Sequence, residues 1–149
     1  MERKPADLVF QRTDRILQLS LRPGTDLRLE GKEGRPSQLG TKKGELFITI
    51  APEDPNKRGY DWNQRVVFTA NEIELMQLIN AMTFCENLTI DRDSKSLHYF
   101  AYSPTENELK LRRNQNDLYS EESFLLNETE KNLMITMLEV AIPRILGWS

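Results

Sequence analysis

The sequence predicts an α+β fold in which four strands and a helix are followed by four more strands and a second helix. Two segments that match at an offset of 58 residues support this prediction: 68–76 and 126–134 both read apolar, Thr or Asn, two residues, Glu, and later Leu-Met. Apolar residues recur at helical spacing behind each segment, and extended stretches divided by Pro, Gly, Asn and Asp lie before each. A chain of 149 residues suits one domain with a proper core.

Each half is expected to supply four strands. In the first half we expect strands near 14–21, 26–30, 44–51 and 64–68, and in the second near 86–91, 96–102, 107–113 and 121–126. Segment 1–13 is expected to be a flexible N-terminal segment. Residues 14–149 then form a single domain, with the internal repeat spanning 14–84 and 86–149.

Each match marks the start of a predicted helix. Thr69 and Asn127 are predicted N-caps, with Glu72 and Glu130 at the third helical position, where they complete a capping box. The apolar positions that follow are spaced for one face of each helix. They are Ile73, Met76, Leu78, Ile79 and Met82 in the first helix, and Leu133, Met134, Met137, Leu138 and Ile142 in the second.

Enzyme chemistry is poorly represented. His98 is the only histidine, so neither a catalytic triad nor a histidine-rich metal site can be assembled. Cys85 is the only cysteine and falls at a predicted helix end, where a structural thiol is expected. The seven glycines are spread among turns and form no phosphate-binding loop. We therefore expect no catalysis, no cofactor and no metal.

The charge distribution and the targeting signals constrain function and location only loosely. The formal net charge is −3, but Lys and Arg outnumber Asp and Glu within residues 1–70, and the acidic excess lies in 71–149. A basic sheet face on an acidic protein can still follow phosphates. No stretch resembles a membrane span or a secretion signal. We expect a cytoplasmic protein, bacterial or phage and nucleoid-associated, or an organellar one.

Aromatic residues on a predicted strand favour a binding function. Alternation along 96–102 places one set of side chains on each face: His98, Phe100 and Tyr102 on one, Leu97, Tyr99 and Ala101 on the other. One face can pack in the core and leave the rings of the other to stack on bases. Burial of all these rings is an equally weighted alternative, because Tyr and Phe are common in strands.

Basic residues accompany these rings in two places. The next strand carries Lys110 and Arg112 on one face, and the stretch Lys57–Arg65 combines cations with Tyr60 and Trp62. Aromatic rings beside cations suit a single strand of nucleic acid, because every base has a flat face and every phosphate a charge. Tyr60 and Trp62 are equally suited to anchoring a hairpin, and for Trp62 that structural role is favoured.

The sequence resembles the Whirly family of single-stranded DNA-binding proteins, as a distant member unlike those of plants. Three segments carry the resemblance: the basic-Tyr-Asp-Trp run at 57–62, the strand and capped helix at 67–73, and the ending Ile-Pro-Arg-Ile-Leu-Gly-Trp at 142–148. It extends weakly over 14–149. The family implies two four-stranded antiparallel sheets packed crosswise with two helices, and a homotetramer. It also implies binding of single-stranded DNA with little sequence preference, in replication, recombination or repair.

Candidate contacts to nucleic acid come from both lines of reasoning, the aromatics for stacking and the cations for phosphates. They are Arg15, Gln18, Arg28, Phe47, Tyr60, Trp62, His98, Phe100, Tyr102, Lys110 and Arg112. Three alternatives stay open. One is an RNA-binding or annealing protein on the same fold. Another is a transcriptional regulator of the positive-cofactor coactivator type acting on duplex promoters. The third is a scaffold that binds no nucleic acid.

Overall fold

The computed structural model describes residues 7–26, 41–92, 99–115 and 118–147. Its first half contains one four-stranded antiparallel sheet, in the order β1-β2-β5-β6. The strands are β1 (Asp7–Gln11), β2 (Arg15–Arg22), β5 (Glu45–Pro52) and β6 (Val66–Ala70). A short ribbon of β3 (Thr25–Asp26) and β4 (Thr41–Lys42) extends β2 and β5. A single 3₁₀ turn, η2 (Trp62–Gln64), precedes β6, and α1 (Glu72–Phe84) follows it.

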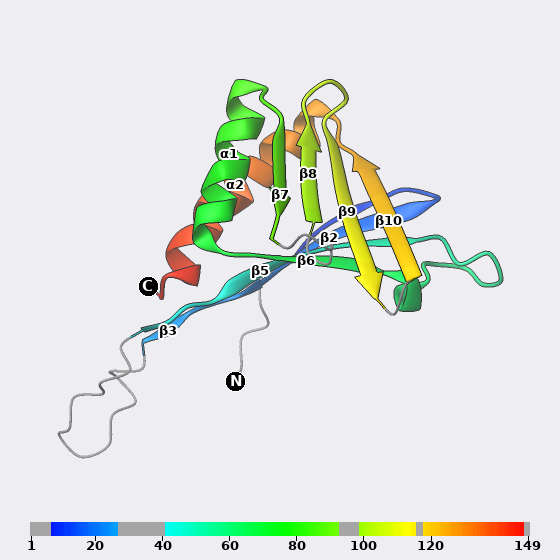
Figure 1. The fold of residues 1–149 in the computed structure, drawn as a ribbon, viewed down its shortest axis with the longest axis horizontal. Coiled ribbons are helices and arrows are strands. Elements are labelled where there is room, and N and C mark those ends of the chain that lie inside the picture. Colours follow the sequence, from blue (N-terminus) through cyan, green and yellow to red (C-terminus); the bar gives the residue numbers. More distant parts are fainter. Residues whose placement is uncertain (1–6, 27–40, 93–98, 116–117, 148–149) are drawn as a thin grey trace, which may run out of the picture.

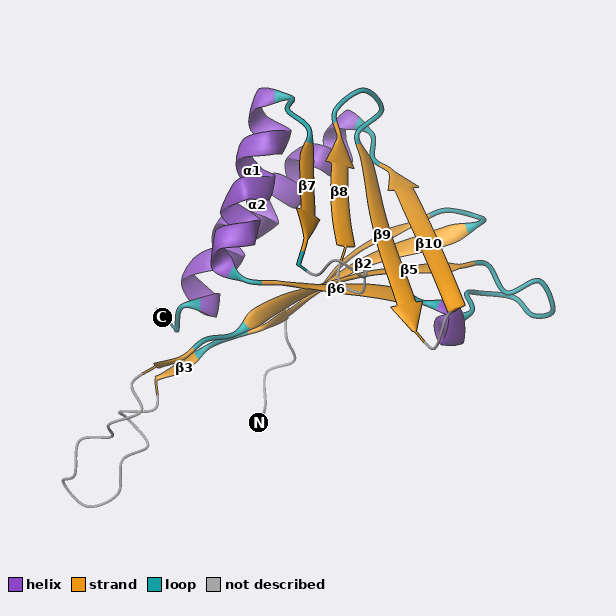
Figure 2. Ribbon diagram, viewed as in Figure 1, coloured by secondary structure: helices purple, strands orange, loops and turns teal. Residues whose placement is uncertain are grey.

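The second half repeats this plan. Its sheet has the order β10-β9-β8-β7, and every neighbouring pair is antiparallel. The strands are β7 (Leu88–Asp91), β8 (Tyr99–Ser103), β9 (Glu108–Gln115) and β10 (Leu118–Leu125), followed by α2 (Glu128–Ile145). The second sheet crosses over the first (Figure 1). The two helices pack on each other beside β7 (Figure 2). The predicted fold class is confirmed.

The first sheet uses a strand that the sequence reading missed. Residues 7–11 form β1, where a flexible segment was expected, and β1 pairs along its whole length with β2. Phe10 is buried and Leu8 packs against the core, so the short Leu-Val-Phe run has enough apolar surface to hold the strand. The expected strand at 26–30 falls almost wholly outside the described residues.

The first helix begins two residues later than predicted. Asn71 is its N-cap: the Asn71 side chain accepts from the Glu74 N–H, and the Glu74 carboxylate accepts from the Asn71 N–H. Thr69 still pairs with Phe47 inside β6, so the assignment of Thr69 and Glu72 to the capping box was wrong. Asn127 and Glu130 form the capping box of α2, as predicted. Asn71 and Asn127 are therefore the equivalent residues of the repeat.

Aromatic rings fill the space between the sheets. Phe68 of β6 and Phe100 of β8 meet with ring centroids 5.3 Å apart, and Phe124 of β10 is fully buried. Leucines and isoleucines of β2 and β5 complete the core from the first sheet, and Leu75, Leu78 and Met82 complete it from α1. Among the described side chains, no buried polar atom lacks a hydrogen-bond partner.

Two arginines join the halves in equivalent ways. Arg92, just after β7, forms an ion pair with Glu74 and donates to the Thr69 carbonyl, with its guanidinium 4.5 Å from the centroid of the Phe68 ring. In this arrangement a residue of the second half completes the capping region of the first helix. We call this the Arg92 clasp.

The Arg12 clasp is its counterpart. Arg12, just after β1, forms an ion pair with Glu130 and donates to the Leu125 carbonyl. Its guanidinium lies 4.7 Å from the centroid of the Phe124 ring. Glu130 and Leu125 occupy the places in the second half that Glu74 and Thr69 occupy in the first. Each half thus supplies the arginine that holds the other half's helix, which makes the contact between the halves reciprocal.

The end of α2 is fixed to the first sheet by two backbone hydrogen bonds. Gly24 donates to the Arg144 carbonyl at 2.7 Å and Gly44 to the Ile145 carbonyl at 2.8 Å. Gly44 is buried against the backbone of residues 22–24, and a Cβ on it would stand 2.6 Å from the Gly24 nitrogen. Only glycine fits at this crossing of three chain segments.

Candidate nucleic-acid interface

The outer face of the second sheet holds the closest grouping of an aromatic ring and cations. Tyr99, Lys110 and Arg112 share this face, because their neighbours Phe100, Leu109 and Leu111 point into the core and are at most 1% exposed. Arg112 is paired directly with Tyr99 across β8 and β9, and its guanidinium lies 4.0 Å from the centroid of the Tyr99 ring. We call Tyr99, Lys110 and Arg112 the Tyr99 cluster.

The cations of the Tyr99 cluster are paired with acidic side chains. Arg112 Nε lies 2.6 Å from Glu121 Oε2, and Lys110 Nζ lies 3.7 Å from carboxylate oxygens of both Glu108 and Glu121. Ala101 and Thr89 continue the row beside Lys110 toward β7. The face is therefore mixed in charge, with the small side chains Ala101 and Thr89 in the row of Lys110 and a half-buried Tyr99 in the row of Arg112.

Phe100 and Tyr102, two of the predicted contacts, belong to the core. Each is 1% exposed. Phe100 packs on Phe68, and the Tyr102 hydroxyl donates to Asn107 Oδ1 at 2.7 Å. Burial raises the pKa of Tyr102 above its usual range. These rings cannot stack on a bound base in this structure, so their assignment as contacts was wrong. Tyr99 lies on the opposite face of the same strand and is half-buried.

The outer face of the first sheet is uncharged in its middle. Gln18 and Thr49 are direct partners across β2 and β5, and Thr49 in turn is paired with Val67 of β6. Phe47 lies one row away and is half-buried. Gln18 donates to Asp7 Oδ2 at 3.3 Å. Gln18 and Phe47 thus lie on an outward-facing surface, with a ring and an amide suited to contacts with bases.

Arg15 connects the two sheets at their junction. Its Nη1 donates to the Ser123 carbonyl of β10 at 2.6 Å, and its Nη2 lies 3.1 Å from Asp14 Oδ2. A cavity of about 360 Å³ opens here, lined by Arg12, Asp14, Arg15, Glu108, Ser123 and Leu125. Burial raises the pKa of the nearby Glu122 carboxyl, and the charge of Arg15 opposes that rise.

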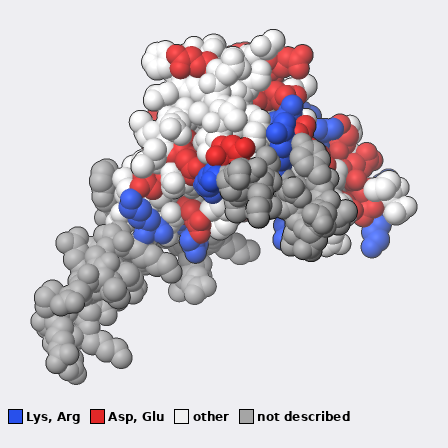
Figure 3. All heavy atoms as spheres, in the orientation of Figure 1, with Lys and Arg blue, Asp and Glu red and all other residues white. Residues whose placement is uncertain are grey.

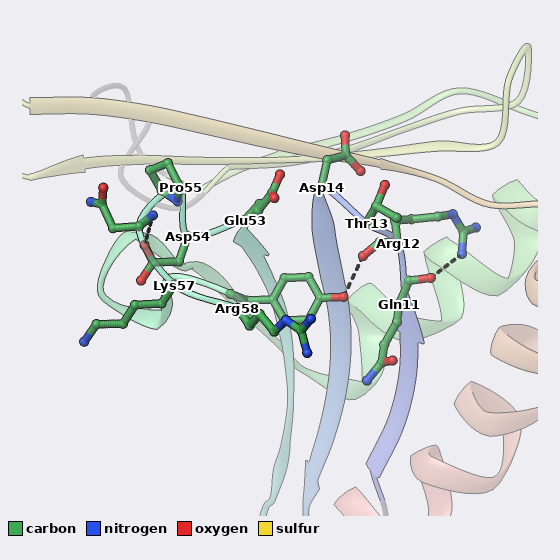
Figure 4. A pocket seen from close by; sticks show the side chains of 12 residues that line it. Gln11, Arg12, Thr13, Asp14, Glu53, Asp54, Pro55, Lys57 and Arg58 are labelled. Carbon is green, nitrogen blue, oxygen red and sulfur yellow. Dashed lines mark hydrogen bonds between the residues drawn. The ribbon is translucent and has the colours of Figure 1, made fainter.

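The hairpin over residues 53–60 borders a larger depression. It has a volume of about 1060 Å³ and lies between this hairpin and residues 11–14 (Figure 4). The Tyr60 hydroxyl donates to the Arg12 carbonyl at 2.6 Å, which ties the hairpin to the first sheet. Lys57 points away from residues 12–14 in Figure 4, and both Lys57 and Arg58 are exposed. Trp62 follows on η2, 40% exposed.

The three cavities share lining residues and form a series from the second sheet to the first, which we call the path. Glu108 lines both the junction cavity and a smaller one beside Tyr99 and Lys110, and Arg12 and Asp14 line both the junction cavity and the hairpin depression. On the face drawn in Figure 3, basic and acidic side chains are intermixed rather than gathered into separate patches. A ligand along this path would meet the Tyr99 and Tyr60 rings and charged side chains of both signs.

The predicted contacts that lie within the described residues fall into three groups. Lys110 and Arg112 lie together on the second sheet; Gln18, Phe47, Arg15, Tyr60 and Trp62 lie on or beside the first. Phe100 and Tyr102 are internal. Arg28 and His98 lie outside the described residues. Tyr99 was not among the predicted contacts, although the alternation along 96–102 had already placed it on the face opposite Phe100.

Within the described residues, no group of three or more His, Cys, Asp or Glu side chains is arranged to hold a metal ion. No helix of the described segments is long and apolar enough to cross a membrane.

Crossed four-stranded antiparallel sheets closed by two helices define an α+β protein with a Whirly-like fold. Three solved structures resemble the chain along 99% of its length. WHY3 from Arabidopsis thaliana has a TM-score of 0.76 at 17% identity, with 92% of its chain covered. The plant transcriptional regulator PBF-2 has 0.75 at 14%, with 86% covered. WHY1 from Arabidopsis thaliana has 0.74 at 16%, with 89% covered. No family model and no curated protein sequence matches the chain. At these identities the likeness is one of fold.

Proposed function

We propose that this chain binds single-stranded DNA with little sequence preference, as a homotetramer acting in replication, recombination or repair. The observation that carries the proposal is the Tyr99 cluster: a half-buried ring with a guanidinium stacked on it and a lysine in the next row, on an open sheet face. A base can stack on the ring or on the guanidinium plane while its phosphates meet the cations. Such contacts recognise no particular base, because every base has a π-face.

The Whirly-like fold and the path of cavities support the same function. The path is lined by residues of both sheets, and Tyr60 lines it as a further ring. Balanced charges along the path favour stacking over charge as the main source of affinity.

Exposed apolar side chains on the helices support assembly. Ile73 and Met76 of α1 are 63% and 47% exposed, and Leu133 of α2 is 50% exposed. The sequence pattern had placed these residues among the apolar positions at helical spacing. A face of this kind on a folded chain is typical of a protein interface. We infer that the helices pack against other copies of the chain in the tetramer.

Transcriptional regulation is a second candidate, because one structure of the same fold is that of a plant transcriptional regulator. An RNA-binding role is a third, since stacking alone does not distinguish DNA from RNA; contacts to the 2′-hydroxyl do that. Matched DNA, RNA and duplex oligonucleotides in competition would separate these functions.

A titration of fluorescent oligo-dT tests the proposal. We expect the anisotropy to rise with protein at low salt, and the affinity to fall as salt increases, because phosphate contacts release counterions. Duplex of the same length should compete poorly. No change in anisotropy at low salt, or equal affinity for duplex, would overturn the proposal.

Replacing Tyr99 with alanine should weaken oligo-dT binding by about 5- to 150-fold, because stacking on one ring contributes roughly 1–3 kcal/mol per base. Tyr99→Phe keeps the ring and should bind like the wild type. The readout is the dissociation constant from the same titration, with circular dichroism to confirm that both variants fold. Equal affinity of Tyr99→Ala and wild type would show that bases do not stack at this face.

A further inference from the structure

Glu121 occupies the position on the Tyr99 cluster that a phosphate would take. Its carboxylate is 2.6 Å from Arg112 Nε and 3.7 Å from Lys110 Nζ, so one acid meets both cations. Guanidinium binds carboxylate and phosphate with the same planar arrangement of donors. We propose that Glu121 is an internal competitor for phosphate, and that nucleic acid binds this face by displacing the Glu121 carboxylate. The inference rests on the function proposed above and specifies how that face is regulated.

The exposure of its acid distinguishes this pair from the two clasps, whose arginines are exposed to a similar extent. The side chains of Glu121 and Arg112 are 30% and 29% exposed, whereas Glu74 and Glu130, the acids of the two clasps, are 10% and 12% exposed. An exposed carboxylate is stabilised by water when it leaves its partner, so exchange costs little free energy. The buried acids of the clasps have no such alternative.

Arg112 does not depend on Glu121 for its position. Its guanidinium also lies 4.0 Å from the centroid of the Tyr99 ring, an attraction that persists when the carboxylate moves away. After displacement the guanidinium still faces outward beside the ring. The contact with the Tyr99 ring therefore keeps the Arg112 guanidinium in place to bind a phosphate while a base stacks beside it.

Charge balance gives the competition its measurable consequence. Lys110 and Arg112 face Glu108 and Glu121, so the four side chains together carry no net charge. In the wild type the displaced carboxylate gathers counterions as the phosphate releases them, which reduces the salt dependence of binding. In Glu121→Gln no carboxylate is left to gather counterions, so the salt dependence of binding should increase.

The test compares Glu121→Gln with wild type in the oligo-dT titration over a salt series. We expect Glu121→Gln to bind about 3- to 10-fold more tightly at low salt. The slope of log affinity against log salt should steepen by as much as about 0.7, the value of one phosphate contact on a single strand. Glu108→Gln, which releases Lys110 alone, should give a smaller gain in the same direction.

Glu45→Gln is the matched control. Glu45 is the direct cross-strand partner of Arg22 on the first sheet, as Glu121 is of Arg112 on the second, and the change in net charge is identical. We expect Glu45→Gln to bind like the wild type. A loss of cross-strand stability alone would alter melting in both variants without changing the salt slope of either.

The outcomes separate this inference from the proposed function. If wild type binds and Glu121→Gln shows the same affinity and slope, or if Glu45→Gln gains as much as Glu121→Gln, the competition is disproved and the function stands. If only Glu121→Gln binds, the competition is supported in its strongest form. If neither protein binds at low salt, the proposed function fails and the inference fails with it.

Discussion

Replacing Arg12 and Arg92 together with methionine is expected to lower the free energy of unfolding by about 4 kcal/mol, roughly 2 for each arginine, which is between the effects of exposed and buried ion pairs. Methionine keeps much of the apolar stem over Phe124 and Phe68 but removes the charge. Glu74 and Glu130 would then remain largely buried without their cations. A loss of this size is a large part of the stability of a typical domain. Urea denaturation followed by circular dichroism measures it.

Two controls identify the source of that loss. Arg22→Met removes an arginine whose pair with Glu45 is exposed, and should change stability by less than about 0.5 kcal/mol. The second control is the pH dependence of the stability loss.

The hydrogen bond from Arg12 holds the pKa of Glu130 below its usual range. A carboxyl whose folded pKa is lowered stabilises the protein above its unfolded pKa, about 4.3, and that contribution disappears as pH falls through the lowered folded value. The stability difference between wild type and Arg12→Met should therefore shrink below about pH 4. A difference that is constant from pH 7 to pH 3 would mean that the Arg12 ion pair contributes nothing.

Gly44→Ala is expected to lower the free energy of unfolding by about 3 kcal/mol, a large effect for one methyl group. The new Cβ would meet the Arg22 carbonyl oxygen and the Gly24 nitrogen, both backbone atoms that cannot rotate away. Relief requires the β2 and β5 segments to separate where Gly24 and Gly44 hold the end of α2. Thermal and urea unfolding give the size of the effect.

Gly59→Ala is the contrasting substitution. Gly59 has φ +110°, which disfavours a side chain, but no atom lies within 4 Å of the added Cβ. Only the backbone strain remains, so we expect a loss of about 1–2 kcal/mol. A loss in Gly44→Ala no greater than in Gly59→Ala would show that the packing of the three segments at Gly44 is not critical.

Local patterns in the sequence predicted the fold well because each element is locally consistent. Capping signals, helical spacing and turn residues located both helices and the strand segments around them. The predicted start of the first helix was two residues too early because Thr69 and Asn71 are both good N-caps. Thr69 pairs with Phe47 as part of β6, so the helix begins after Asn71. Strand β1 was missed because its three apolar residues become a strand only when β2 is beside them.

The candidate site was predicted only in part, for a similar reason. Alternation along β8 correctly separated Phe100 and Tyr102 from Tyr99, but both faces carry rings. The choice of the buried face depends on Phe68, 32 positions earlier in the chain than Phe100 and on the other sheet. Lys110 and Arg112 were placed correctly opposite Leu109 and Leu111, because a strand with leucines on one face and cations on the other leaves no ambiguity.

The two clasps are alike in chemistry but differ in the length of chain that they close. Arg92 and Glu74 are 18 residues apart, whereas Arg12 and Glu130 are 118 apart. Closing a longer loop costs more chain entropy, so the Arg92 contact can form as soon as α1 and β7 meet, while the Arg12 contact must wait for nearly the whole chain. During synthesis the Arg92–Glu74 ion pair could therefore form as soon as the start of the second half has emerged. The Arg12–Glu130 ion pair would form last, after α2 has been synthesised. The two clasps are thus equivalent in the folded structure but form one after the other during folding.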